Sequence, residues 1–114
     1  MIEVREYLDA RGHSPYAAWF AHLNSKAAAK VAVSATRLAS GNFSNVKGVG
    51  SGIFEYKIDF GSGYRICFGK DGETLVILLG GGTKKHQQRD IETASVSWQA
   101  CKRRKREEEH GPNT

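Results

Sequence analysis

The segment over residues 53–70, IFEYKIDFGSGYRICFGK, most constrains what this chain can fold into. Apolar and polar residues alternate on both sides of a Gly-Ser-Gly sequence, which is typical of two strands joined by a tight turn. Because successive side chains of a strand point to opposite faces, Glu55, Lys57 and Asp59 are predicted to share one face. The return strand brings Arg65 back beside them. The hairpin therefore predicts a basic surface carried by a β-sheet.

The charge balance indicates what such a surface could bind. The 114 residues contain 17 Lys and Arg against 12 Asp and Glu, which gives a net charge of +5. A basic balance favours an acidic partner: nucleic acid, an anionic protein, or both. The length corresponds to one domain, which can bury a single core without disulfides or metal.

The remaining elements follow from the apolar periodicity and from capping residues. The order β-α-α-β-β-β-α predicts an α+β fold with an antiparallel core, the first strand at an edge and a helical pair on one face. The opposite face of the sheet, or its rim, is expected to stay open for a ligand. The expected elements are a strand over 2–8, a helix starting at Ser14, and a second helix over 26–39 that Asn24-Ser25 caps. A glycine-rich connection over 41–52, strands over 53–60, 64–69 and 74–80, a polar loop and a last helix opening at Asp90 follow.

We predict a single domain over residues 1–104 and a charged, disordered tail over 105–114. Cys67 and Cys101 are predicted to be buried free thiols, and with four scattered histidines they form no metal-ligand spacing. We therefore expect no metal and no cofactor.

The longest apolar run, residues 75–79, is too short to span a bilayer. Charged residues interrupt the N-terminus, which therefore does not match a secretory signal. We expect a cytoplasmic protein with no membrane partner.

A series of short motifs along the chain carries a family resemblance. They are Lys47-Gly48, Glu55-Tyr56-Lys57-Ile58, Gly63-Tyr64-Arg65-Ile66, a strand ending in Gly-Gly before Thr83-Lys84-Lys85, and Ile91-Glu92-Thr93-Ala94. In this order they resemble the RelE/ParE superfamily of toxins from type II toxin–antitoxin systems, in its HigB-like branch of addiction-module killer proteins. The resemblance implies a RelE-like fold and a toxin that cuts messenger RNA in the ribosomal A site. It also implies an antitoxin partner, typically a helix-turn-helix protein.

The resemblance also implies roles for individual residues. Lys57 matches a basic strand residue of RelE-type nucleases, and Arg65 matches the arginine of a tyrosine-arginine pair on the next strand. Lys84 or Lys85 matches a basic residue just after the last strand. Metal-free cleavage uses the ribose 2′-hydroxyl as nucleophile, so the phosphorane's negative charge must be stabilised. Arg65 suits that task because its planar fork grips two phosphate oxygens.

Two positions depart from the RelE pattern. Asp59 stands where RelE-type enzymes carry a second lysine, and no tyrosine follows Tyr64. His86 is expected to take over proton transfer, as histidines do in HigB-like relatives, with Asp59 as the other candidate. Lys47 and the run Lys102, Arg103 and Arg104 are predicted to bind RNA.

Other interpretations fit the same residues. Arg65 could pair with Glu55 or Asp59 across the hairpin, and the basic run after residue 101 could be a solvated helix end. The ParE branch inhibits DNA gyrase without nuclease chemistry, and a third reading is an inactive module that binds only an antitoxin or nucleic acid. Tyr56 and Tyr64 are predicted to point away from Lys57 and Arg65, toward the core.

Overall fold

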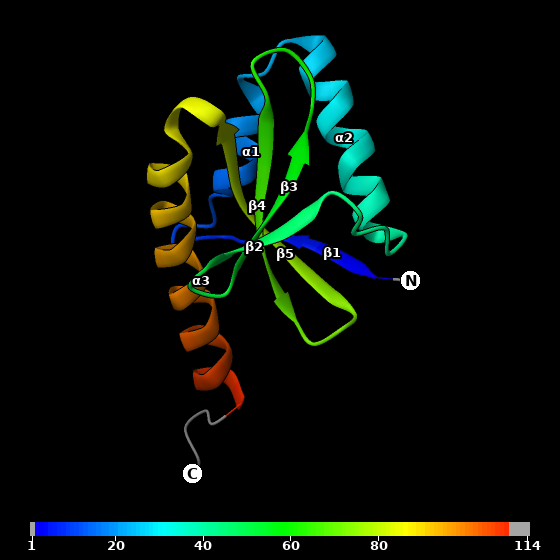
Figure 1. The fold of residues 1–114 in the computed structure, drawn as a ribbon. Helices are drawn as coiled ribbons and strands as arrows, with labels where there is room; N and C mark the ends of the chain where they lie inside the picture. The colour runs from blue at the N-terminus through cyan, green and yellow to red at the C-terminus, as the bar shows by residue number, and fades with distance from the viewer. Residues whose placement is uncertain (1, 110–114) are drawn as a thin grey trace.

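The computed structural model describes residues 2–109 and has an α+β fold (Figure 1). A five-stranded mixed sheet carries two helices on one face and a long C-terminal helix on the other. The elements are β1 (Glu3–Glu6), α1 (Pro15–Ala21), α2 (Ser25–Ala39), β2 (Val46–Gly50), β3 (Ile53–Ile58), β4 (Tyr64–Asp71), β5 (Leu75–Thr83), the 3₁₀ turn η1 (Lys84–His86) and α3 (Gln87–Glu109).

The strands lie in the order β1-β5-β4-β3-β2. β1 pairs in parallel with β5, and the other neighbours are antiparallel, so the predictions of an antiparallel core and of a first strand at the edge are confirmed. The prediction that residues 41–52 form only a glycine-rich connection is wrong, because they contain β2, which pairs with β3 and forms the other edge of the sheet. Gly48 and Gly50 hid this strand, since glycine weakens strand propensity and here flanks an irregular step in the pairing.

Both predicted helix starts are confirmed by side-chain caps. Ser14 Oγ accepts a hydrogen bond from the Ala17 amide at 2.9 Å, at the start of α1. Asn24 Oδ1 accepts one from the Ala27 amide at 2.9 Å, at the start of α2. Each cap satisfies an amide that has no partner within its helix, which fixes where the helix begins.

The larger apolar core lies between the helical pair and the sheet. Tyr56 points into it and is buried, as predicted, and Tyr64 packs against it half-buried. Trp19 lies over Gly81, where a Cβ atom would collide with its ring. The buried members are Tyr16, Val31, Leu38, Tyr56, Ile58, Ile66, Phe68, Val76 and Leu78.

The other face of the sheet is covered by α3. Trp98 lies flat against β4, where a Cβ atom on Gly69 would come within 2.6 Å of its ring. Cys67 is buried in this second cluster and Cys101 packs against it half-buried; both are free thiols. The second face of the sheet was one of two places expected to stay open for a ligand, and that expectation is wrong. α3 covers this face, because Gly69 leaves room for the indole ring of Trp98.

α3 is longer than predicted at both ends. It begins at Gln87 rather than Asp90, and η1 replaces the expected polar loop before it. It continues to Glu109, so residues 105–109 are helical rather than disordered. Lys105 Nζ lies 2.6 Å from Asp71 Oδ2 and ties this end to the sheet. Residues 110–114, the rest of the expected tail, lie outside the described residues.

Within residues 2–109, no helix has the length and apolar character needed to cross a membrane.

Candidate functional site

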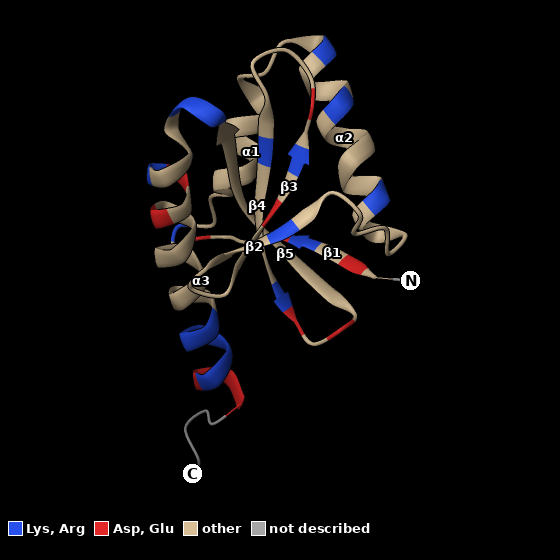
Figure 2. Cartoon of the chain, in the orientation of Figure 1, with Lys and Arg blue, Asp and Glu red and all other residues tan. Residues whose placement is uncertain are grey.

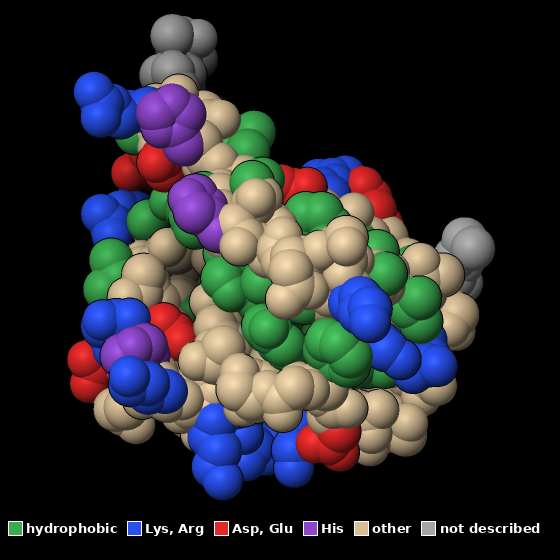
Figure 3. Space-filling view, turned by 90° about the horizontal axis from the view of Figure 1, so that it is seen from above, with side chains coloured by type: hydrophobic (Ala, Val, Ile, Leu, Met, Phe, Trp, Pro, Cys, Tyr) green, Lys and Arg blue, Asp and Glu red, His purple; other side chains and the backbone are tan. Residues whose placement is uncertain are grey.

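A shallow pocket of about 320 Å³ opens beside the turn between β3 and β4. Its lining consists of Lys57, Asp59, Phe60, Gly61, Ser62, Gly63, Arg65 and Lys84. Figure 2 shows basic segments on β3, on β4 and at the start of α3 at this same end of the sheet, and Figure 3 shows that end from above. Three residues predicted for catalysis thus line one pocket, although they come from three separate elements.

The pairing of the strands explains how these residues meet. Lys57 of β3 lies directly opposite Arg65 of β4, and Arg65 lies opposite Gly82 of β5. Lys84 follows β5 immediately, as the first residue of η1. Because β4 is the middle strand of the three, its Arg65 side chain is flanked by both neighbours.

Each strand cation of the pocket has an acidic neighbour. Lys57 Nζ lies 3.7 Å from Asp59 Oδ1, and both side chains are exposed. An exposed pair of this kind contributes little free energy, so Lys57 can exchange Asp59 for an anionic ligand. Arg65 Nε lies 3.5 Å from Glu55 Oε1, with side chains only 9% and 2% exposed. The alternative prediction that Arg65 pairs with Glu55 across the hairpin is therefore confirmed, and the pair is buried.

Lys85 and His86 lie on η1 but do not line the pocket. All three residues of η1 are exposed, and Lys84 is the one that lines the pocket. The sequence left open whether Lys84 or Lys85 belongs to the site, and the structure places Lys84 in the pocket lining. Asp59 is the acidic residue that lines this pocket within the described chain.

The four predicted RNA-binding residues lie outside this pocket. Lys47 is exposed on the edge strand β2. Lys102, Arg103 and Arg104 lie on α3, and two of them have intramolecular contacts: Lys102 Nζ lies 5.7 Å from the ring centre of Trp98, and Arg104 Nη1 donates a hydrogen bond to the Leu8 carbonyl at 2.8 Å. Part of the basic run therefore serves to hold the helix in place.

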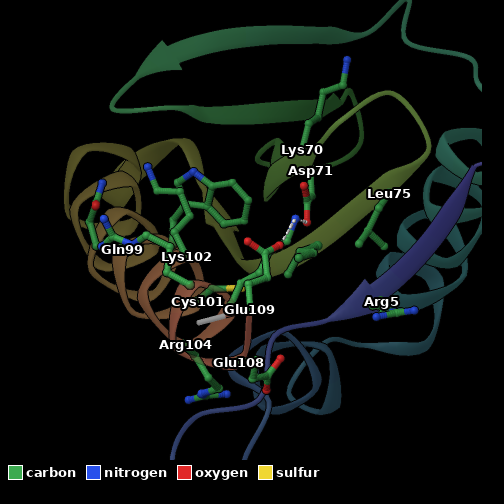
Figure 4. Close-up of a pocket in the computed structure, with 14 residues that line it drawn as sticks. Arg5, Lys70, Asp71, Leu75, Gln99, Cys101, Lys102, Arg104, Glu108 and Glu109 are labelled. Carbon is green, nitrogen blue, oxygen red and sulfur yellow. Dashed lines mark hydrogen bonds and ion pairs between the residues drawn. The ribbon is translucent and has the colours of Figure 1, made fainter. Parts of the chain in front are cut away.

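Lys102 and Arg104 line a second pocket of about 700 Å³. Figure 4 shows side chains of α3 on one side of it and those of β4 and β5 on the other. Trp98 and Ile77 contribute apolar surface, and the acidic residues Glu108 and Glu109 stand among the cations. Its lining holds three acidic residues, counting Asp71, whereas the lining of the hairpin pocket holds one, Asp59.

The hairpin pocket is suited chemically to bind phosphate. An arginine fork accompanied by two lysines can donate hydrogen bonds to a phosphodiester and stabilise the extra charge of a phosphorane, although Asp59 and the buried Glu55 offset part of the positive charge. Among the residues that the structure describes, no group of three or more His, Cys, Asp and Glu side chains is placed to hold a metal ion.

Comparison with known proteins finds a relative in Haemophilus influenzae. It is 44% identical to this chain over 79 residues, which cover 68% of this chain and 80% of the relative. The chain belongs to the same family as this protein. The relative is described only as an uncharacterized protein. No family model matches the sequence.

In this chain, one residue next to the pocket was not predicted from the sequence to contact the site. Gln87 was expected in a polar loop, but it opens α3 and its Nε2 donates a hydrogen bond to Glu55 Oε1 at 2.8 Å. The contact joins residues 32 positions apart, so no local pattern could have revealed it.

Asp90 is a further acidic residue close to this region, in the first turn of α3. Its carboxylate lies against Gly82, where a Cβ atom would collide with it. Burial raises the pKa of Asp90, while Arg89 and His86 oppose the increase. The folded state thus binds the proton more tightly than the unfolded state does.

We expect a pH-dependent gain in stability from Asp90→Asn. A raised pKa in the folded state means that stability is lost as pH rises from the ordinary aspartate pKa of about 3.9 through the folded pKa. Asn carries no charge at any pH, so the variant should exceed the wild type in free energy of unfolding at pH 7. Urea titrations at pH 7 and pH 3 test this. A difference that does not shrink at pH 3 would contradict it.

Proposed function

We propose that this chain is the toxin of a type II toxin–antitoxin pair and acts as a metal-independent, ribosome-dependent endoribonuclease on messenger RNA. The observation that carries the proposal is the convergence of Lys57, Arg65 and Lys84 on one pocket at the hairpin. The RelE/ParE resemblance had singled out these residues from three separate motifs. Their common pocket carries positive charge of the kind that stabilises the phosphorane in RNA cleavage.

The topology supports the same proposal. A helical pair follows the edge strand and packs on one face of the antiparallel strands, and a C-terminal helix packs on the other. We infer a RelE-like, HigB-branch fold from this arrangement together with the sequence motifs. The partners that follow are the ribosome with its messenger RNA, and a co-expressed antitoxin of the helix-turn-helix type, all in the cytoplasm.

In the proposed reaction the 2′-hydroxyl attacks the adjacent phosphate and the 5′-oxygen leaves. Arg65 binds the non-bridging oxygens and stabilises the phosphorane, and Lys57 and Lys84 add positive charge. Asp59 lines the pocket, which makes it the acid–base candidate already in place, while His86 would act from η1 beside the pocket.

Induced expression in bacteria tests the function directly. We expect growth arrest together with new transcript 5′-ends inside translated codons, and the ends should vanish when translation is blocked. Arrest with intact transcripts would overturn the nuclease proposal. Absence of arrest would leave a module that binds its antitoxin or nucleic acid.

The gyrase alternative keeps one specific observation in its favour. Asp59 replaces a lysine of RelE-type nucleases and pairs with Lys57 at 3.7 Å, which reduces the net charge of the pocket. A ParE-like inhibitor needs no phosphate chemistry. DNA-damage induction with uncut transcripts in the same experiment would support this alternative.

The two neighbouring lysines of η1 provide a matched pair of variants. Lys84→Ala should lower the ribosome-dependent cleavage rate roughly tenfold, since it removes one charge from the pocket but leaves Arg65. Lys85→Ala removes the same charge outside the pocket lining and should change the rate by less than about twofold. Single-turnover cleavage of messenger RNA on programmed ribosomes measures both. Equal losses would show that the lining does not define the site.

A further inference from the structure

Beneath the hairpin pocket lies a buried carboxylate. Glu55 is 1% exposed in the middle of β3. Its Oε1 accepts the hydrogen bond from Gln87 and lies 3.5 Å from Arg65 Nε. Its Oε2 is buried without a hydrogen-bond partner among the described residues, and so is Arg65 Nε.

Stability alone does not account for this pair. Burying two charges costs solvation free energy that their attraction does little more than offset, and apolar residues of similar volume often stabilise a fold as well or better. The surroundings offer little solvation to a charge, as the neighbouring Cys67 thiol indicates. Burial raises the pKa of this thiol to about 12, and Glu55 and Asp90 add to the increase. A charged pair that gains little stability from its burial can instead serve the site above it.

The geometry divides the Arg65 side chain into two parts. Its Nε is on the buried side, next to Glu55, while the residue also lines the pocket. A guanidinium is rigid and planar, so an ion pair at Nε restricts the rotation of the plane in which the two terminal nitrogens lie, even without a hydrogen bond at Nε. With Nε on the buried side, the terminal nitrogens are the part of the fork left to serve the pocket.

We propose that Glu55 is a positioning residue that orients the Arg65 fork toward a phosphate in the hairpin pocket, and that Gln87 holds Glu55 in place. Its consequence for catalysis rests on the proposed function. Fixing the fork before the substrate arrives removes a reorganisation step from the reaction.

The same segment also links the two sides of the pocket. Lys84 opens η1 and lines the pocket, and Gln87 follows three residues later at the start of α3. The hydrogen bond from Gln87 to Glu55 thus ties the segment that carries Lys84 to the strand pair that carries Lys57 and Arg65. One buried carboxylate therefore sets the relative placement of all three cations.

Glu55→Gln tests this, because it removes the charge and keeps the size of the side chain. The Arg65 Nε–H signal in ¹H–¹⁵N spectra, assigned by its loss in Arg65→Lys, should exchange with water at least about tenfold faster in the variant. Single-turnover cleavage on ribosomes should slow about 10²-fold with little change in half-saturating concentration, since binding charge is kept but orientation is lost. Glu73→Gln, the same change at an exposed turn, should alter neither.

Two further variants keep the test decisive if Glu55→Gln folds poorly. Gln87→Met leaves the charges intact and should also speed the exchange of the Arg65 Nε–H with water, by a smaller factor than Glu55→Gln does. Glu55→Asp restores the carboxylate and should recover part of the cleavage rate that Glu55→Gln loses. An unchanged Arg65 signal in folded Glu55→Gln or Gln87→Met would overturn the proposal. If the signal responds but the wild type cuts no RNA, the orienting contact is supported and the nuclease function fails.

Discussion

Arg65→Lys should lower ribosome-dependent cleavage by at least about 10²-fold and abolish growth inhibition, while the protein stays folded. The substitution keeps a positive charge beside the buried Glu55 carboxylate but removes the planar fork that binds two phosphate oxygens. Growth after induction, mapped transcript 5′-ends and single-turnover rates measure the effect. Circular dichroism confirms the fold.

The lysine variant is a sharper test than Arg65→Ala. Alanine would leave Glu55 buried without a counter-charge, which typically costs about 3–5 kcal/mol and could unfold the domain. Arg37→Lys, the same chemical change at an exposed position of α2, is the matched control and should leave cleavage unaltered. Full toxicity of a folded Arg65→Lys protein would rule out the proposed role of Arg65.

Trp98→Ala should lower the free energy of unfolding by about 3–5 kcal/mol, the usual cost of removing a large buried aromatic side chain. Trp98 is 6% exposed and is the largest side chain by which α3 packs on the sheet. Its ring fills the space above Gly69, and its Nε1 comes within 3.1 Å of the position a Cβ on Gly52 would take. Chemical denaturation followed by circular dichroism measures the loss.

Val96→Ala provides the control on the same helix. Val96 is 72% exposed, so its truncation should change the unfolding free energy by no more than about 0.5 kcal/mol. A loss below about 1 kcal/mol for Trp98→Ala would contradict the structure, because it would mean that α3 does not depend on this ring for its place on the sheet.

The sequence alone determined the local features of this protein. The hairpin of β3 and β4 follows from the alternation that leads into a glycine turn, and the starts of α1 and α2 follow from the Ser14 and Asn24 caps. The outward placement of Lys57 and the inward placement of Tyr56 follow from the two-residue period of a strand. Each depends on neighbours within a few positions, which is the range over which a sequence pattern carries information.

Only the tertiary structure decided the features that depend on distant segments. β2 exists because the edge of β3 offers it partners, although its glycines disfavour a strand. α3 covers the face expected to be open, and its first residue reaches across to Glu55. Lys84, and not Lys85, lines the pocket because the backbone of η1 places two adjacent side chains differently relative to the hairpin. The burial of the Glu55–Arg65 pair and the pocket above it arise from the packing of α3 and η1 against the β3–β4 hairpin, which no local pattern in the chain specifies.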